Sequence, residues 1–143
     1  NNIHRSLSEL TELSEKRLAC AAAEILNTDK NACELERIFY ENGNAERAEY
    51  GSLSNCDEIF KAIGSSLADG MPCDAGINVL NQNDYEIMWE VNPNVHIPFW
   101  EKSPLSVSLF FDLRDAWLRG FFSNISCAAY TRLGENIFKM EEI

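Results

Sequence analysis

The sequence lacks the short motifs that identify the commonest metal and nucleotide sites. It has no GxxxxGK or GxGxxG phosphate loop, no calcium loop of EF-hand spacing and no CxxC pair. It also has no apolar run near the roughly 18 residues that a membrane-spanning helix needs, and no signal-peptide pattern. We therefore expect no metal, cofactor or membrane, and one domain spanning residues 1–143.

Positive charge is scarce. Lys and Arg together number 12 against 23 Asp and Glu, which gives a formal net charge of −11. A chain with so few cations is poorly suited to displace the counterions of nucleic acid or to dock on anionic lipid, so neither partner is expected. A basic protein partner is favoured, because long-range attraction raises its rate of encounter. Solubility alone is the competing interpretation of the acidity.

The five cysteines show no metal-ligand spacing, and their number is odd. We interpret most of them as small buried apolar groups, with Cys20 and Cys127 in Ala-rich packing segments. Free cysteines of this kind are typical of a reducing compartment, so the chain is expected in the cytoplasm.

Residues from about 4 to 70 have the pattern of helices. Leu7, Leu10, Leu13 and Leu18 recur at roughly helical spacing, with carboxylates elsewhere on the cylinder. Side-chain caps and glycine stops then predict where the helices begin and end. These boundaries are a capping box over Ser6–Glu9, caps at Asp29 and at Ser54 or Asn55, and ends at Asn42-Gly43 and Gly70.

Residues from about 75 to 143 have the pattern of strands. Segments 77–80 and 85–91 flank the turn residues 81–84, and segments 125–132 and 137–142 flank a turn at 134–136. In the second segment the alternation places Tyr85, Ile87, Trp89 and Val91 on one face and Glu86, Met88 and Glu90 on the other. The whole predicts an α+β fold, with the helical half packed on a small, mainly antiparallel sheet of about four or five strands.

Residues 104–111 fit two structures. Ser103 followed by Pro104 is a plausible start of a helix. Leu105, Val107, Leu109 and Phe111 alternate with serines, however, which is the period of a strand. We favour the strand, followed by a helix over about 113–123.

A long stretch has no cation at all. Between Lys61 and Lys102 there is no Lys or Arg, while acids and aromatic residues are frequent. Uncancelled carboxylates beside exposed aromatics would form a docking face for a basic partner. The alternative is that the aromatics are core and the acids only solvate a hairpin. The predicted partner-binding residues are Asp74, Asp84, Glu86, Glu90, Trp100 and Glu101.

Catalytic candidates are few, and we expect no enzyme. Cys73 and His96, each in a loop, would form a thiolate–imidazole pair only if the fold brought them into contact. Glu86 and Glu90 share a strand face but are too far apart to share a proton directly. A small enzyme with scattered Cys, His and carboxylate groups therefore remains only an alternative.

The segment Asp115-Ala116-Trp117-Leu118-Arg119-Gly120, followed by Ser126-Cys127-Ala128-Ala129-Tyr130-Thr131, resembles part of a known family. It is similar to a helix–strand step in immunity proteins of bacterial contact-dependent growth inhibition systems, in which a Trp-bearing helix precedes a small-residue strand. The resemblance implies an acidic, single-domain inhibitor that neutralises a cognate toxin domain, often a nuclease with a basic active site. It assigns no functional residue.

The leading hypothesis is therefore a bacterial, acidic inhibitor that blocks the basic active-site groove of a toxin. A type III-like secretion chaperone is the alternative from another class, and it predicts a homodimer with a large exposed apolar surface.

Overall fold

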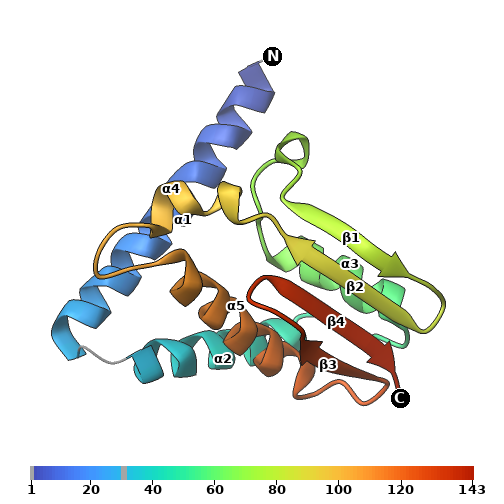
Figure 1. The fold of residues 1–143 in the computed structure, drawn as a ribbon. Helices are drawn as coiled ribbons and strands as arrows, with labels where there is room; N and C mark the ends of the chain where they lie inside the picture. Colours follow the sequence, from blue (N-terminus) through green and yellow to red (C-terminus); the bar gives the residue numbers. More distant parts are fainter. Residues whose placement is uncertain (1, 30–31) are drawn as a thin grey trace.

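The computed structural model, which describes residues 2–29 and 32–143, has helices packed against a four-stranded antiparallel sheet (Figure 1). This confirms the predicted α+β class. The helices are α1 (Asn2–Asp29), α2 (Ala32–Ala48), α3 (Cys56–Ser66), α4 (Ile97–Trp100) and α5 (Val107–Phe122), with short 3-10 turns η1 (Pro72–Asp74) and η2 (Pro93–Val95). The strands are β1 (Ile77–Gln82), β2 (Glu86–Val91), β3 (Ala128–Arg132) and β4 (Ile137–Glu142). Within the described ranges, no helix is both long and apolar enough to cross a bilayer.

The sheet joins two hairpins in the order β1-β2-β4-β3. Both hairpins were predicted, and the pairing of β2 with β4 connects them, placing Trp89 opposite Phe138. The alternation predicted for β2 is confirmed by the burial of Ile87, Trp89 and Val91. Tyr85 is the exception, because it lies in the two-residue turn before β2 and is 69% exposed.

Helix α5 replaces the strand predicted over 105–111. It begins at Val107, and the Ser106 hydroxyl caps it by accepting the Leu109 N–H at 3.0 Å. The strand prediction was wrong because α5 is buried on several sides, so its apolar residues do not follow the one-sided helical period. The alternative prediction, a helix capped by Ser103, gave the correct type of element, but its cap lies three residues before the observed cap at Ser106.

Helices α2 and α5 cross through a pair of glycines. A Cβ at Gly43 would collide with the carbonyl oxygen of Trp117, and a Cβ at Gly120 would collide with that of Tyr40. The predicted end of the helix at Gly43 was therefore wrong. Gly43 lies buried inside α2, where its lack of a side chain allows the close approach of α5. The contact fixes α5 between α2 and the sheet (Figure 1).

Helix α1 begins earlier than predicted and packs through its second half. It starts at Asn2, so Ser6–Glu9 lies inside the helix and does not cap it. Ala19 and Ala22 are buried, whereas Cys20 is exposed, contrary to the prediction. The N-terminal turns project beyond the rest of the fold (Figure 1), and the leucines predicted as their core face are exposed: Leu7, Leu10, Leu13 and Leu18. The cap predicted at Asp29 involves a side chain outside the described part of the chain.

Helix α3 confirms one predicted cap. The Asn55 side chain accepts the Glu58 N–H at 2.9 Å, and Asp57 and Glu58 lie at the positive end of the helix. Ile59 and Ile63 on this helix are buried. The helix ends at Ser66, earlier than the predicted stop at Gly70, which adopts a left-handed φ of 77° in the following loop.

Candidate functional site

The structure places the predicted docking residues in several elements. Asp84 and Glu86 flank Tyr85 at the turn between β1 and β2, and Glu90 lies near the far end of β2. Asp74 ends η1, and Glu101 follows α4. Of these residues, only Asp84 and Glu86 lie beside each other, one on each side of Tyr85.

Trp100 cannot be a surface anchor, because its side chain has no exposed area. It packs on Phe110, with the ring centroids 5.2 Å apart. The prediction of an exposed tryptophan was wrong because α4 and α5 close over it. The sequence does not show this contact, since an indole suits an interface and a core equally well.

Two of the predicted acids serve the local backbone. Asp74 accepts the Met71 N–H at 2.7 Å and so closes η1. Glu101 accepts the Val107 N–H at 3.2 Å, at the start of α5. Both side chains remain exposed. Their hydrogen bonds account for them structurally without a partner.

A cluster of acids surrounds the turn between β1 and β2. Glu86 lies directly opposite Glu141 on β4, and the Glu142 N–H donates to the Tyr85 carbonyl at 2.8 Å. Asp84 precedes Tyr85, whose side chain projects into solvent. We call Asp84, Tyr85, Glu86, Glu141 and Glu142 the Tyr85 corner. It lies where β4 ends at the C-terminus (Figure 1).

Lys139 neutralises part of this corner. Two carboxylates directly opposite each other on neighbouring strands repel. The Lys139 ammonium reduces that repulsion by lying 3.7 Å from Glu86 and 3.4 Å from Glu141. Asp84 and Glu142 have no cation partner among the described residues. The corner therefore keeps an unbalanced negative charge beside an exposed phenol.

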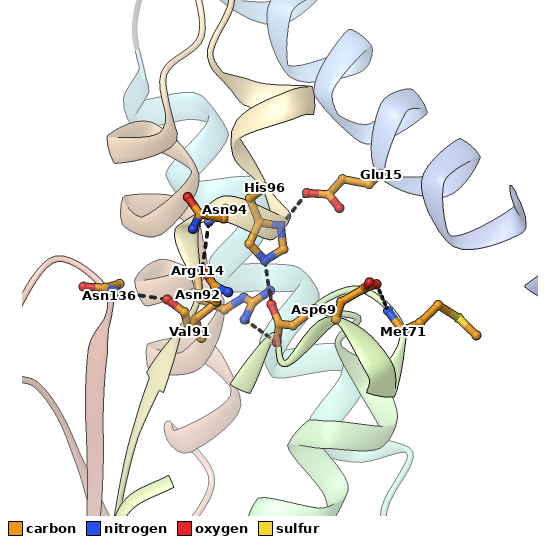
Figure 2. Close-up of polar contacts among 10 residues, drawn as sticks. Glu15, Asp69, Met71, Val91, Asn92, Asn94, His96, Arg114 and Asn136 are labelled. Carbon is orange, nitrogen blue, oxygen red and sulfur yellow. Dashed lines mark hydrogen bonds and ion pairs between the residues drawn. The ribbon is translucent and has the colours of Figure 1, made fainter. Parts of the chain in front are cut away.

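The predicted Cys73–His96 pair does not form. His96 is fully buried, and its ring nitrogens contact two carboxylates (Figure 2). The exposed Cys73 instead has its Sγ 3.6 Å from Nε2 of His4 on α1. His96 was predicted in a loop, but its position before α4 directs the imidazole inward against Phe110, with ring centroids 4.0 Å apart.

A buried ionic network surrounds His96. Its Nδ1 lies 2.5 Å from Glu15 Oε1, and its Nε2 lies 2.8 Å from Asp69 Oδ1. Arg114 donates to both Asp69 oxygens, at 3.1 and 2.8 Å. Figure 2 shows that the four side chains come from α1, the loop after α3, the residue before α4, and α5. The network therefore connects the projecting helix α1 to the body of the protein.

The network shifts two pKa values. Burial alone would raise the pKa of Asp69, but Arg114 and His96 outweigh burial and lower it. Burial alone would lower the pKa of His96, but its hydrogen bonds to Asp69 and Glu15 outweigh burial and raise it. A protonated His96 balances the four charges, which is the state expected of paired buried ions. Because His96 is completely buried, its imidazole cannot touch a substrate in this structure.

No metal centre is found in the described part of the chain, since nowhere do three or more His, Cys, Asp or Glu side chains gather suitably. Glu141 and Glu142 are not among the predicted binding residues, and the alternative interpretation of the cation-free stretch placed its aromatic residues, Tyr85 among them, in the core. The turn chemistry around Asn83 could have signalled the exposure of Tyr85, because the Asn83 side chain accepts the N–H groups of Tyr85 and Glu86. The pairing of β2 with β4, which completes the corner, has no local signal.

Comparison of the chain with protein families, curated proteins and solved structures finds no match. The function is therefore inferred from the geometry and charge of the described residues. Two features stand out: the Tyr85 corner on the surface and a pocket beside the buried network.

Proposed function

We propose that the chain is an acidic protein-binding inhibitor that docks on a basic partner through the Tyr85 corner. One observation carries the proposal: Tyr85 is 69% exposed, it directly follows Asp84, and its carbonyl accepts the Glu142 N–H, while neither of these two acids has a cation partner in the described structure. Tyrosine is a common interface anchor, since it gives a large contact area at low entropic cost. The net charge of −11 adds long-range attraction to a basic surface.

More specifically, we propose that the chain is an immunity protein that acts in the bacterial cytoplasm. Its partner is a cognate toxin, such as a nuclease, whose cationic groove would otherwise hold phosphates. Asp84 and Glu142 occupy that groove, Glu86 and Glu141 flank it, and Tyr85 packs against its wall. Inhibition is stoichiometric and involves no catalysis by this chain. Charge accelerates association, and burial of the phenol slows release.

A capture experiment with matched variants tests the proposal. The immobilised chain should retain one basic protein from the source cell and release it at high salt. Asp84→Lys with Glu142→Lys, or Tyr85→Ala alone, should abolish capture. The control Glu24→Lys with Glu49→Lys makes the same change in net charge at two exposed residues, one in α1 and one just after α2, and it should retain the protein. Equal capture by the corner variants and the wild type would remove the corner as the docking site.

One observation favours a second candidate, the secretion chaperone. Helix α1 exposes Leu7, Leu10, Leu13 and Leu18, by 42 to 59% of their surfaces. Contiguous exposed apolar side chains mark surfaces that bind other chains. This candidate requires a homodimer in solution, so light scattering that gives the mass of one chain, 16.2 kDa, would count decisively against it.

A further inference from the structure

A pocket of about 360 Å³ lies where α1, α2 and α5 meet the end of α3. Its volume is near the lower end of small-molecule sites, which span roughly 300–1,000 Å³. Most of its wall is apolar, and Leu18 and Ile38 at the wall are partly exposed. The main apolar side chains are Leu18, Ile38, Phe39, Leu67, Phe110 and Trp117.

The aromatic walls are fixed in place. The Trp117 indole N–H donates to the Asn42 side chain at 3.0 Å, and its ring stacks on Phe121 with centroids 5.2 Å apart. The Phe110 ring stacks on His96, and the guanidinium carbon of Arg114 lies 5.1 Å from the Phe110 centroid. A wall held by such contacts is formed before any ligand binds, which lowers the entropic cost of binding.

Three charged side chains line the pocket, and two of them are already paired. Glu15 contacts His96, and Arg114 contacts Asp69, as Figure 2 shows. The third is Glu46, which accepts only the Ser66 hydroxyl at 3.1 Å and has no cation partner in residues 2–29 or 32–143. A half-buried carboxylate therefore stands unneutralised among apolar walls.

We propose that this pocket binds a small organic cation, an amine or guanidine carried on an apolar body. The cationic group donates charge-assisted hydrogen bonds to Glu46. The apolar body contacts Leu18, Ile38 and the ring of Trp117, which line the pocket. A neutral ligand would remove the hydration of the Glu46 carboxylate without supplying an opposite charge, and an anion would be repelled by it. The site is separate from the Tyr85 corner and goes beyond the inhibitor function.

Calorimetric titration with a matched pair of probes tests the proposal. The full chain is titrated at neutral pH with 2-phenylethylammonium and with 2-phenylethanol, which differ mainly in charge. The amine should bind at least about tenfold more tightly than the alcohol, the difference expected of one charge-assisted hydrogen bond. Glu46→Gln should remove that preference. Glu49→Gln, an equal change of charge at an exposed residue outside the pocket wall, should preserve it.

A second variant tests the pocket by filling it with a larger side chain. Ile38 is 37% exposed at the wall, so Ile38→Trp can block the pocket without disturbing the core, and it should weaken both probes. Circular dichroism should show that each variant keeps its helices. The proposal is overturned if the amine fails to bind at millimolar concentration, if both probes bind equally, or if Glu46→Gln and Ile38→Trp leave amine affinity unchanged. Capture of a protein partner is a separate readout, so the two proposals can fail independently.

Discussion

His96 and Asp69 form a hydrogen-bonded ion pair in the interior, with Nε2 of the imidazole 2.8 Å from Oδ1 of the carboxylate. Both side chains are almost without exposed area. The imidazole also contacts Glu15, and the carboxylate also contacts Arg114. Glu15, Asp69 and Arg114 are the three charged neighbours that set the protonation of His96, and the network makes folding stability depend on pH.

The stability contributed by His96 should fall as the solution becomes alkaline. Its folded-state pKa is raised above the ordinary value of about 6.5, so its contribution is complete below about pH 6.5 and is lost as pH rises through the folded pKa. His96→Gln should lower the free energy of unfolding by about 3–5 kcal/mol at pH 6, because it removes the only cationic partner of the largely buried Glu15 and one of the two cationic partners of Asp69. Urea denaturation across pH 6 to about 9 measures this. A variant with the same pH slope as the wild type in that range would contradict the assigned pairing.

Asp69 should produce the opposite dependence in acid. Its folded-state pKa is lowered, so its contribution is present above the ordinary value of about 3.9 and is lost as pH falls toward the folded pKa. Asp69→Asn should therefore destabilise the protein most near neutral pH and progressively less in acid. Chemical denaturation of the two proteins between about pH 3 and pH 7 gives the difference. A constant difference over this range would show that folding does not lower the pKa of Asp69.

Glu15 should hold α1 against the body. It is the member of the network that α1 contributes, and α1 buries little else besides Ala19 and Ala22. Glu15→Gln should speed amide hydrogen exchange in α1 by about tenfold while leaving α5 protected. Glu12→Gln, at an exposed residue one turn earlier, is the control and should change neither helix. Unchanged exchange in α1 of Glu15→Gln would show that the ion pair does not hold the helix.

The glycine crossing gives a stability prediction with an internal control. Gly43→Ala and Gly120→Ala should each cost about 1–3 kcal/mol, since the added methyl group meets backbone of the facing helix. Gly64→Ala in α3 adds the same atoms where nothing lies within 4 Å, and it should stabilise by about 0.5–1 kcal/mol. Thermal denaturation compares the three variants. If Gly43→Ala proved as harmless as Gly64→Ala, the two helices would not approach so closely.

What the sequence could predict was local. The pleat of β2, the Asn55 cap and both hairpins depend on neighbours within a few residues, and each was confirmed. The errors arose where a distant segment decides the outcome. Gly43 looks like a helix stop until α5 packs against it, and the apolar residues of α5 look like a strand because several elements cover that helix.

The candidate sites follow the same division. Asp84 and Glu86 were predicted from the cation-free stretch, which is visible in the sequence. Glu141 and Glu142 joined them only through the pairing of β2 with β4, which has no local signal. Trp100 was assigned to the surface, although contact with Phe110 buries it. The pocket at Glu46 depends on four helices meeting and could not be foreseen from any one of them.

The association rate of the chain with its captured partner tests the docking claim most directly. Stopped-flow measurement at low and high salt should show fast, salt-sensitive association for the wild type. Asp84→Lys with Glu142→Lys should slow association at low salt by about tenfold or more and flatten its dependence on salt. The matched reversal at Glu24 and Glu49 should slow it far less, because those exposed residues are not part of the corner. Identical rates and salt slopes for the two double variants would contradict docking through the Tyr85 corner.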